Sequence, residues 1–200
     1  MKKTIWRPLV LGVVFGLLAG IATVTGLSFL TPGITQNAIG FYVTLFLLAA
    51  ALGGPLAGAI APAIMMIISA LFGPPEMKEI ITIPAVFWSN LLALVITVTL
   101  VGFAYRLIFD RLKMPAPLLA WAGIVIAYYL ISIPASIIPQ YYLSGDPTSE
   151  ILPAVLGAYK IYIPQAIFDI CFTSLVFIAL PARYRRPLWC ESKKALEQTG

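Results

Sequence analysis

The sequence has 200 residues, of which 60% are hydrophobic and only 10% are charged, with a formal net charge of +5 and no histidine. A soluble domain carries roughly 25% charged residues, because water must solvate its surface. A chain this poor in charge covers its exterior only where that exterior faces lipid, so we expect an integral membrane protein. The lack of histidine removes the commonest metal ligand and general base. We therefore expect no metal, no cofactor and no enzymatic activity.

Six apolar segments are predicted to cross the membrane, since about 20 apolar residues span roughly 30 Å of hydrocarbon. The first is longer than the core of a secretory signal and lacks a clear cleavage site, so we expect it to be retained. A short surface helix is expected near residues 149–158, after the capping residues of the last long loop. The predicted transmembrane helices are 8–30, 39–52, 56–72, 84–109, 117–138 and 163–180. They form one all-α domain over residues 1–181, followed by a short basic tail, 182–200.

The join between the second and third segments is only Gly53-Gly54-Pro55. Glycine and proline together favour a tight turn between antiparallel helices. Both flanking segments are short, so one long kinked helix is the alternative. With six crossings both ends lie on the same side of the membrane.

The basic residues indicate which side that is, because cytoplasmic loops are rich in lysine and arginine. If the N-terminus is cytoplasmic, all but two of the 13 basic residues fall on the cytoplasmic side. The two exceptions are Lys78 and Lys160. The asymmetry predicts that both termini are cytoplasmic, and it accounts for the positive charge without a nucleic-acid partner.

The first segment carries Gly12, Gly16 and Gly20, spaced four residues apart. Small residues at this spacing form a flat helix face that another helix can approach closely. That helix belongs either to the same chain or to another subunit. For a partner-docking surface, these three glycines are the candidates.

Polar and aromatic residues gather on the predicted outer side. Aromatic rings with a polar edge, together with amides, suit a site for a small, flat, polar metabolite. Tyrosine and tryptophan also collect at membrane interfaces as anchors without any ligand, which is the alternative. The candidates for ligand contact on this side are Asn37, Glu79, Trp88, Asn90, Tyr141 and Tyr159.

Asp169 is a further candidate for ligand contact, because it lies inside the sixth apolar segment. A carboxylate within a membrane is costly and usually faces a cavity or a partner. It either contacts substrate, pairs with Lys160 or Lys78, is protonated, or makes a structural hydrogen bond within the bundle.

The layout resembles the substrate-binding S components of energy-coupling-factor (ECF) vitamin transporters. Residues 47–59, Leu-Leu-Ala-Ala-Ala-Leu-Gly-Gly-Pro-Leu-Ala-Gly-Ala, look like that family's hydrophobic-Gly-Pro-x-x-Gly passage between helices two and three. The glycine face of the first segment is similar to the family's helix-one docking motif, although alanines are usual there. The last helix, followed by Arg183-Tyr184-Arg185-Arg186, also fits.

The resemblance implies a six-helix subunit that captures a vitamin from outside and depends on a transmembrane coupling subunit and two ATPases. The lack of histidine argues against the family members that carry metal ions. The same Gly-Gly-Pro passage is similar to the multi-helix input regions of certain cell-wall-linked sensor kinases. A sensor or assembly protein acting through a partner, and a stand-alone ion-coupled permease, are therefore alternative functions.

Overall fold

The structure is a computed structural model that describes residues 3–25, 28–30, 38–73, 83–109 and 116–180. Five of its helices are long and apolar enough to cross a membrane. They are α1 (Lys3–Val24), α2 (Phe41–Phe72), α4 (Pro84–Phe109), α5 (Ala116–Ser144) and α6 (Ile151–Ala179). The short helix η1 (Thr148–Glu150) precedes α6, and strands β1 (Ser28–Leu30) and β2 (Ala38–Gly40) pair antiparallel between α1 and α2. The expectation of a bundle of long apolar helices is confirmed, apart from this short pair of strands.

Helix α2 changes direction at Gly54, where φ is 76° and ψ is −169°. A β-carbon built on Gly58 would lie 3.2 Å from the Ala50 β-carbon, although eight residues of continuous helix would separate them by about 12 Å. The chain therefore reverses at Gly54 into two helical arms, 41–53 and 55–72, that lie side by side. The predicted break at Gly53-Gly54-Pro55 lies at this reversal.

The ends of the other helices differ from the prediction in two situations: where a strand takes the place of expected helix, and where a helix continues through a proline that was expected to end it. Helix α1 ends at Val24 instead of residue 30, and α2 begins after the strand, at Phe41. Helices α5 and α6 run through the stretch expected to be mostly loop and surface helix, so the expected bounds 117–138 and 163–180 are too short. Prolines 134, 139 and 164 lie inside these helices, which membrane helices tolerate when neighbours satisfy the freed carbonyls. Helix α4 covers the same residues as predicted, and the tail 182–200 lies outside the described residues.

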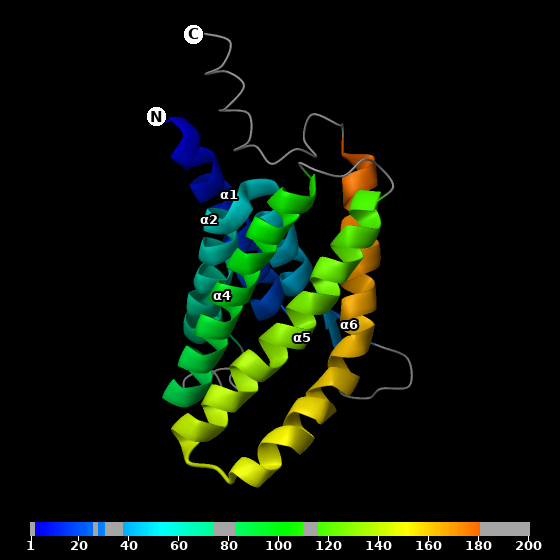
Figure 1. Cartoon of the computed structure of the whole chain (residues 1–200). Helices are drawn as coiled ribbons and strands as arrows, with labels where there is room; N and C mark the ends of the chain where they lie inside the picture. Colours follow the sequence, from blue (N-terminus) through cyan, green and yellow to red (C-terminus); the bar gives the residue numbers. More distant parts are fainter. Residues whose placement is uncertain (1–2, 26–27, 31–37, 74–82, 110–115, 181–200) are drawn as a thin grey trace.

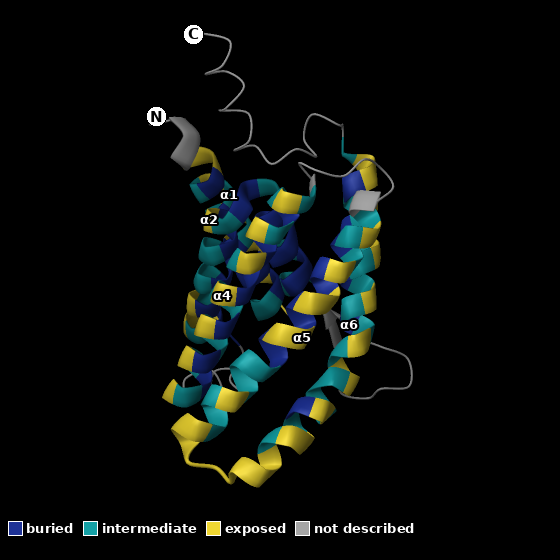
Figure 2. Ribbon diagram, viewed as in Figure 1, coloured by how far each residue is buried: buried dark blue, intermediate teal, exposed yellow. Residues whose placement is uncertain are grey.

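When the two arms of α2 are counted separately, the helices alternate in direction, so that α1 begins and α6 ends at the same end of the bundle (Figure 1). Exposed residues alternate with buried and intermediate ones along α4 and α5 (Figure 2), as expected of helices with one face turned to the bundle. The large hydrophobic side chains that are exposed are mostly leucine and isoleucine, which is the pattern expected of a surface in lipid.

An aromatic cluster fills the half of the bundle where α6 ends. The rings of Tyr105, Trp121 and Phe177 lie with their centroids 5.1–5.4 Å apart and are almost completely buried. Offset and edge-to-face contacts at this spacing are favourable. These three rings therefore pack the described helices together in this half of the bundle.

Candidate functional site

A cavity of about 440 Å³ lies in the half of the bundle where α4 begins and α5 ends. Its volume falls in the range of small-molecule sites. Side chains from α1, both arms of α2, α4, α5 and α6 line it. Its polar and aromatic lining residues are Thr23, Tyr42, Ser69, Asn90, Tyr128, Tyr129, Ser132, Ser136, Gln140 and Tyr162.

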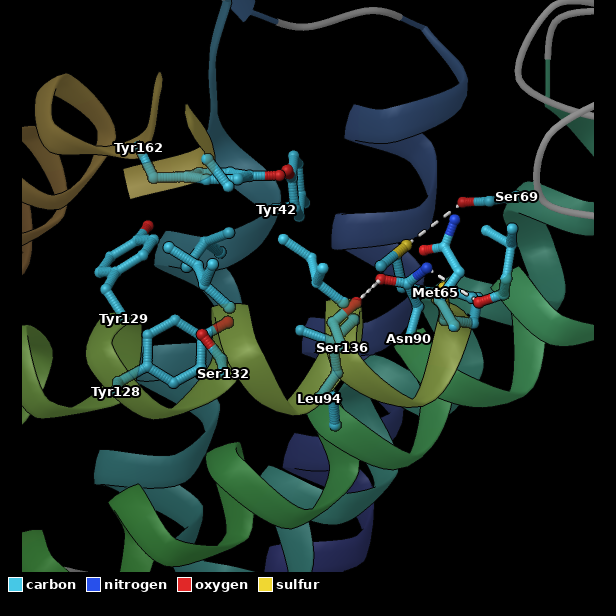
Figure 3. A pocket seen from close by; sticks show the side chains of 18 of the residues that line it. Tyr42, Met65, Ser69, Asn90, Leu94, Tyr128, Tyr129, Ser132, Ser136 and Tyr162 are labelled. Atoms are coloured by element: carbon cyan, nitrogen blue, oxygen red, sulfur yellow. Dashed lines mark hydrogen bonds between the residues drawn. The ribbon is translucent and has the colours of Figure 1, made fainter. Parts of the chain in front are cut away.

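Four tyrosines gather at one end of the cavity (Figure 3). Tyr128 and Tyr129 meet edge to face, with ring centroids 5.0 Å apart, and Tyr129 and Tyr162 lie 6.0 Å apart at a tilt of 33°. The Tyr42 ring packs edge to face on Phe46, with ring centroids 6.0 Å apart. These contacts fix the rings as a preformed aromatic wall.

An amide and two hydroxyls form the other end. Asn90 donates from Nδ2 to the Val86 carbonyl at 2.8 Å and accepts from the Ser136 hydroxyl at 2.5 Å. The two bonds hold the amide in one orientation between α4 and α5 (Figure 3). The Ser69 hydroxyl lies nearby, donating to the Met65 sulfur at 3.2 Å.

Asp169 lies behind the tyrosine wall and is fully buried. Its Oδ2 accepts a hydrogen bond from the Tyr129 hydroxyl at 2.5 Å. Its Oδ1 accepts from Gln165 Nε2 at 3.1 Å and from the Thr44 hydroxyl. Asp169 therefore joins α6 to α5 and to the first arm of α2, and its hydrogen bond to Tyr129 links it to the cavity wall.

Gln165 pairs with the backbone of Gly40, where β2 ends and α2 begins. It accepts from the Gly40 amide at 2.7 Å and donates to the Gly40 carbonyl at 2.9 Å. Non-helical backbone at membrane depth is tolerated only where protein groups satisfy it. Gln165 supplies those groups, so it stabilises the start of α2 inside the bundle.

The predicted ligand contacts divide into three groups. Asn90 lines the cavity, whereas Asp169 lies one residue behind it. Trp88 is 55% exposed on the outside of α4, and neither it nor Tyr141 lines the cavity. Tyr159 also lies outside the cavity and donates to the Leu130 carbonyl at 2.8 Å. Asn37 and Glu79 lie outside the described residues.

Gly12, Gly16 and Gly20 face the second arm of α2. A β-carbon built on Gly16 would lie 2.8 Å from the Ala61 carbonyl oxygen, and those on Gly12 and Gly20 would meet Ile60 and Ile68 within 3 Å. The second arm of α2 in the same chain therefore covers this face, which is the contact that the within-chain alternative expects. A role of the three glycines in docking another subunit stays a prediction.

Sequence reasoning missed most of the cavity wall. Tyr128, Ser132, Ser136 and Gln140 recur every four residues and form one face of α5, and the same spacing relates Gln165, Asp169 and Thr173 on α6. Polar residues at this regular spacing within apolar segments are the sequence pattern that could have predicted the wall. The Thr173 hydroxyl accepts a hydrogen bond from the Trp121 indole at 2.7 Å, which links α6 to α5.

Comparison of the chain with protein-family models, with curated proteins and with solved structures gives no match. The function is therefore inferred from the site itself.

Proposed function

We propose that this chain is the membrane-embedded substrate-binding subunit of a transporter that takes up a small polar metabolite such as a vitamin. The cavity carries this proposal. It lies among membrane-spanning helices, it has the volume of a small-molecule site, and its wall combines fixed aromatic rings with oriented amide and hydroxyl groups.

The proposal includes six crossings with both termini in the cytoplasm. The second arm of α2 has 18 residues and a length of about 27 Å, and the first arm has 13 residues and a length of about 20 Å. The first arm is short for a span, but it begins at Gly40, whose backbone Gln165 satisfies within the bundle. This topology places the cavity in the outer half of the membrane, where it meets solute from outside.

Uptake is driven by ATPases that act through a transmembrane coupling subunit, as the resemblance to ECF S components implies. Co-purification of such a subunit with ATPases after gentle extraction supports this part of the proposal.

Native mass spectrometry of the gently purified protein tests the binding function. The wild type is expected to retain a small molecule, and Ala93→Phe is expected to lose it, because Ala93 is buried in the cavity wall and a phenyl ring fills the space. The matched control is Ala127→Phe, at an exposed position on the same bundle. A wild-type spectrum without a ligand, combined with no thermal shift across a panel of vitamins, contradicts the proposal.

A stand-alone ion-coupled permease is the second candidate, favoured by the buried carboxylate of Asp169. Purified protein in liposomes would then move its solute along an ion gradient without ATP. Asp169→Asn would abolish that movement while leaving a folded protein. Transport that appears only when ATPases are added excludes this candidate.

A further inference from the structure

The lack of charged side chains among the described lining residues indicates which kind of molecule the cavity binds. Among the described residues, none of those lining the cavity is aspartate, glutamate, lysine or arginine. A buried charged group is stable only when it is paired and hydrogen-bonded, because its transfer from water is costly. A charged ligand would therefore find no counter-ion among the described residues of this wall.

Asp169 does not supply the missing charge. Both of its carboxylate oxygens are already hydrogen-bonded, to Thr44 and Gln165 on one oxygen and to Tyr129 on the other. It is fully buried and does not line the cavity. A cationic ligand would have to break this network before it could reach the carboxylate.

The two ends of the cavity are complementary to different chemical groups, which one ligand could carry. The tyrosine end presents ring faces and edges, which attract a planar ring. At the other end, the Asn90 amide uses one N–H for Val86 and one lone pair for Ser136. A primary amide has two N–H groups and two lone pairs, so one donor and one acceptor remain for a ligand.

We propose that the cavity binds an uncharged molecule that carries a planar ring and an amide-like group, the ring against the tyrosines and the amide-like group on Asn90. This inference rests on the proposed binding function and narrows its substrate class. It excludes carboxylates and ammonium compounds of the same size.

Three probes that share one ring system test the inference. 2-Naphthamide is neutral, 2-naphthoate is an anion and 2-naphthylmethylammonium is a cation at neutral pH. Binding to the full chain in lipid nanodiscs is measured by calorimetry, and the signal of nanodiscs that hold no protein is subtracted as partition into lipid. Ala127→Phe serves as the control for the added ring.

We expect saturable binding of 2-naphthamide that Ala93→Phe abolishes and Ala127→Phe preserves. The two charged probes should bind about tenfold or more weakly, since neither finds a partner in the wall. Asn90→Leu should weaken 2-naphthamide binding by about tenfold, because the amide then lacks its partner. Thermal unfolding of each variant shows that it is folded.

A charged probe that binds as tightly as 2-naphthamide, at a site blocked by Ala93→Phe, overturns the inference. Absence of binding by all three probes overturns it as well. The proposed binding function is contradicted by a different result: the wild type retains no molecule in native mass spectrometry and no vitamin shifts its unfolding temperature. If the wild type retains a charged molecule, the binding function stands and only the inference of a neutral ligand is overturned.

Discussion

At the scale of single residues, Asp169 shows how one buried carboxylate organises three helices. It accepts hydrogen bonds from Thr44 on α2, Tyr129 on α5 and Gln165 on its own helix. Its backbone carbonyl also accepts from the Thr173 hydroxyl at 2.5 Å. The alternative of a structural hydrogen bond within the bundle, considered from the sequence, describes these contacts. Through Tyr129, the same contacts position one ring of the cavity wall.

Asp169→Ala should lower the free energy of unfolding by about 3 kcal/mol, because it leaves buried hydroxyl and amide donors without an acceptor. Unfolding by denaturing detergent, followed by circular dichroism, measures the change. Asp146→Ala makes the same substitution at an exposed loop position and should change stability little. Equal stability of the two variants would show that the network contributes nothing.

At the scale of the elements, the reversal within α2 depends on one glycine. Gly54 combines positive φ with an extended ψ, a region that is essentially restricted to glycine. Helix α4 approaches this point so closely that a β-carbon on Gly102 would lie 2.7 Å from the Pro55 nitrogen. The turn is therefore held by its own backbone conformation and by a close helix contact.

Gly54→Ala should destabilise the protein by about 1–3 kcal/mol, because the alanine side chain strains this backbone conformation. Detergent unfolding of the variant gives the difference directly. Gly123→Ala is the control, since a β-carbon there meets no atom within 4 Å and the residue lies within helix α5. If the two alanine variants have the same free energy of unfolding, the turn does not require glycine at position 54.

At the scale of the whole molecule, the described helices form one half packed by an aromatic cluster, called here the closed half, and one half that holds the cavity, called here the hollow half. Tyr105, Trp121 and Phe177 fill the half where α6 ends, whereas the cavity occupies the other. The proposed topology turns the hollow half toward the outside. This arrangement suits capture of an external solute, with the closed half as the barrier to the cytoplasm.

Single-cysteine labelling tests that topology in intact cells. Glu150→Cys in a Cys171→Ser, Cys190→Ser background should react with a membrane-impermeant maleimide, because Glu150 is exposed between α5 and α6. Cys171→Ser alone leaves Cys190 in the predicted cytoplasmic tail, and it should react only after permeabilisation. Labelling of Cys190 in intact cells would show that the tail lies outside and that the orientation is the opposite of the one proposed.

The sequence by itself determined the membrane class and the approximate position of most helices, because hydropathy and helical hydrogen bonds are local properties. It also located the break at Gly54, since glycine and proline act on their own backbone. It misjudged the length of α5 and α6, which continue through internal prolines. In α5 the Leu130 carbonyl, which Pro134 leaves without its helical donor, accepts from the Tyr159 hydroxyl of α6.

Only the tertiary structure decided which polar residues meet. Thr44 and Asp169 are 125 residues apart, and no local pattern links them. The same holds for the tyrosine wall, which combines residues of α2, α5 and α6, and for the glycine face of α1, whose partner proved to be α2. A cavity is the space left by packing several helices together, so its position and lining depend on contacts that a single segment does not contain.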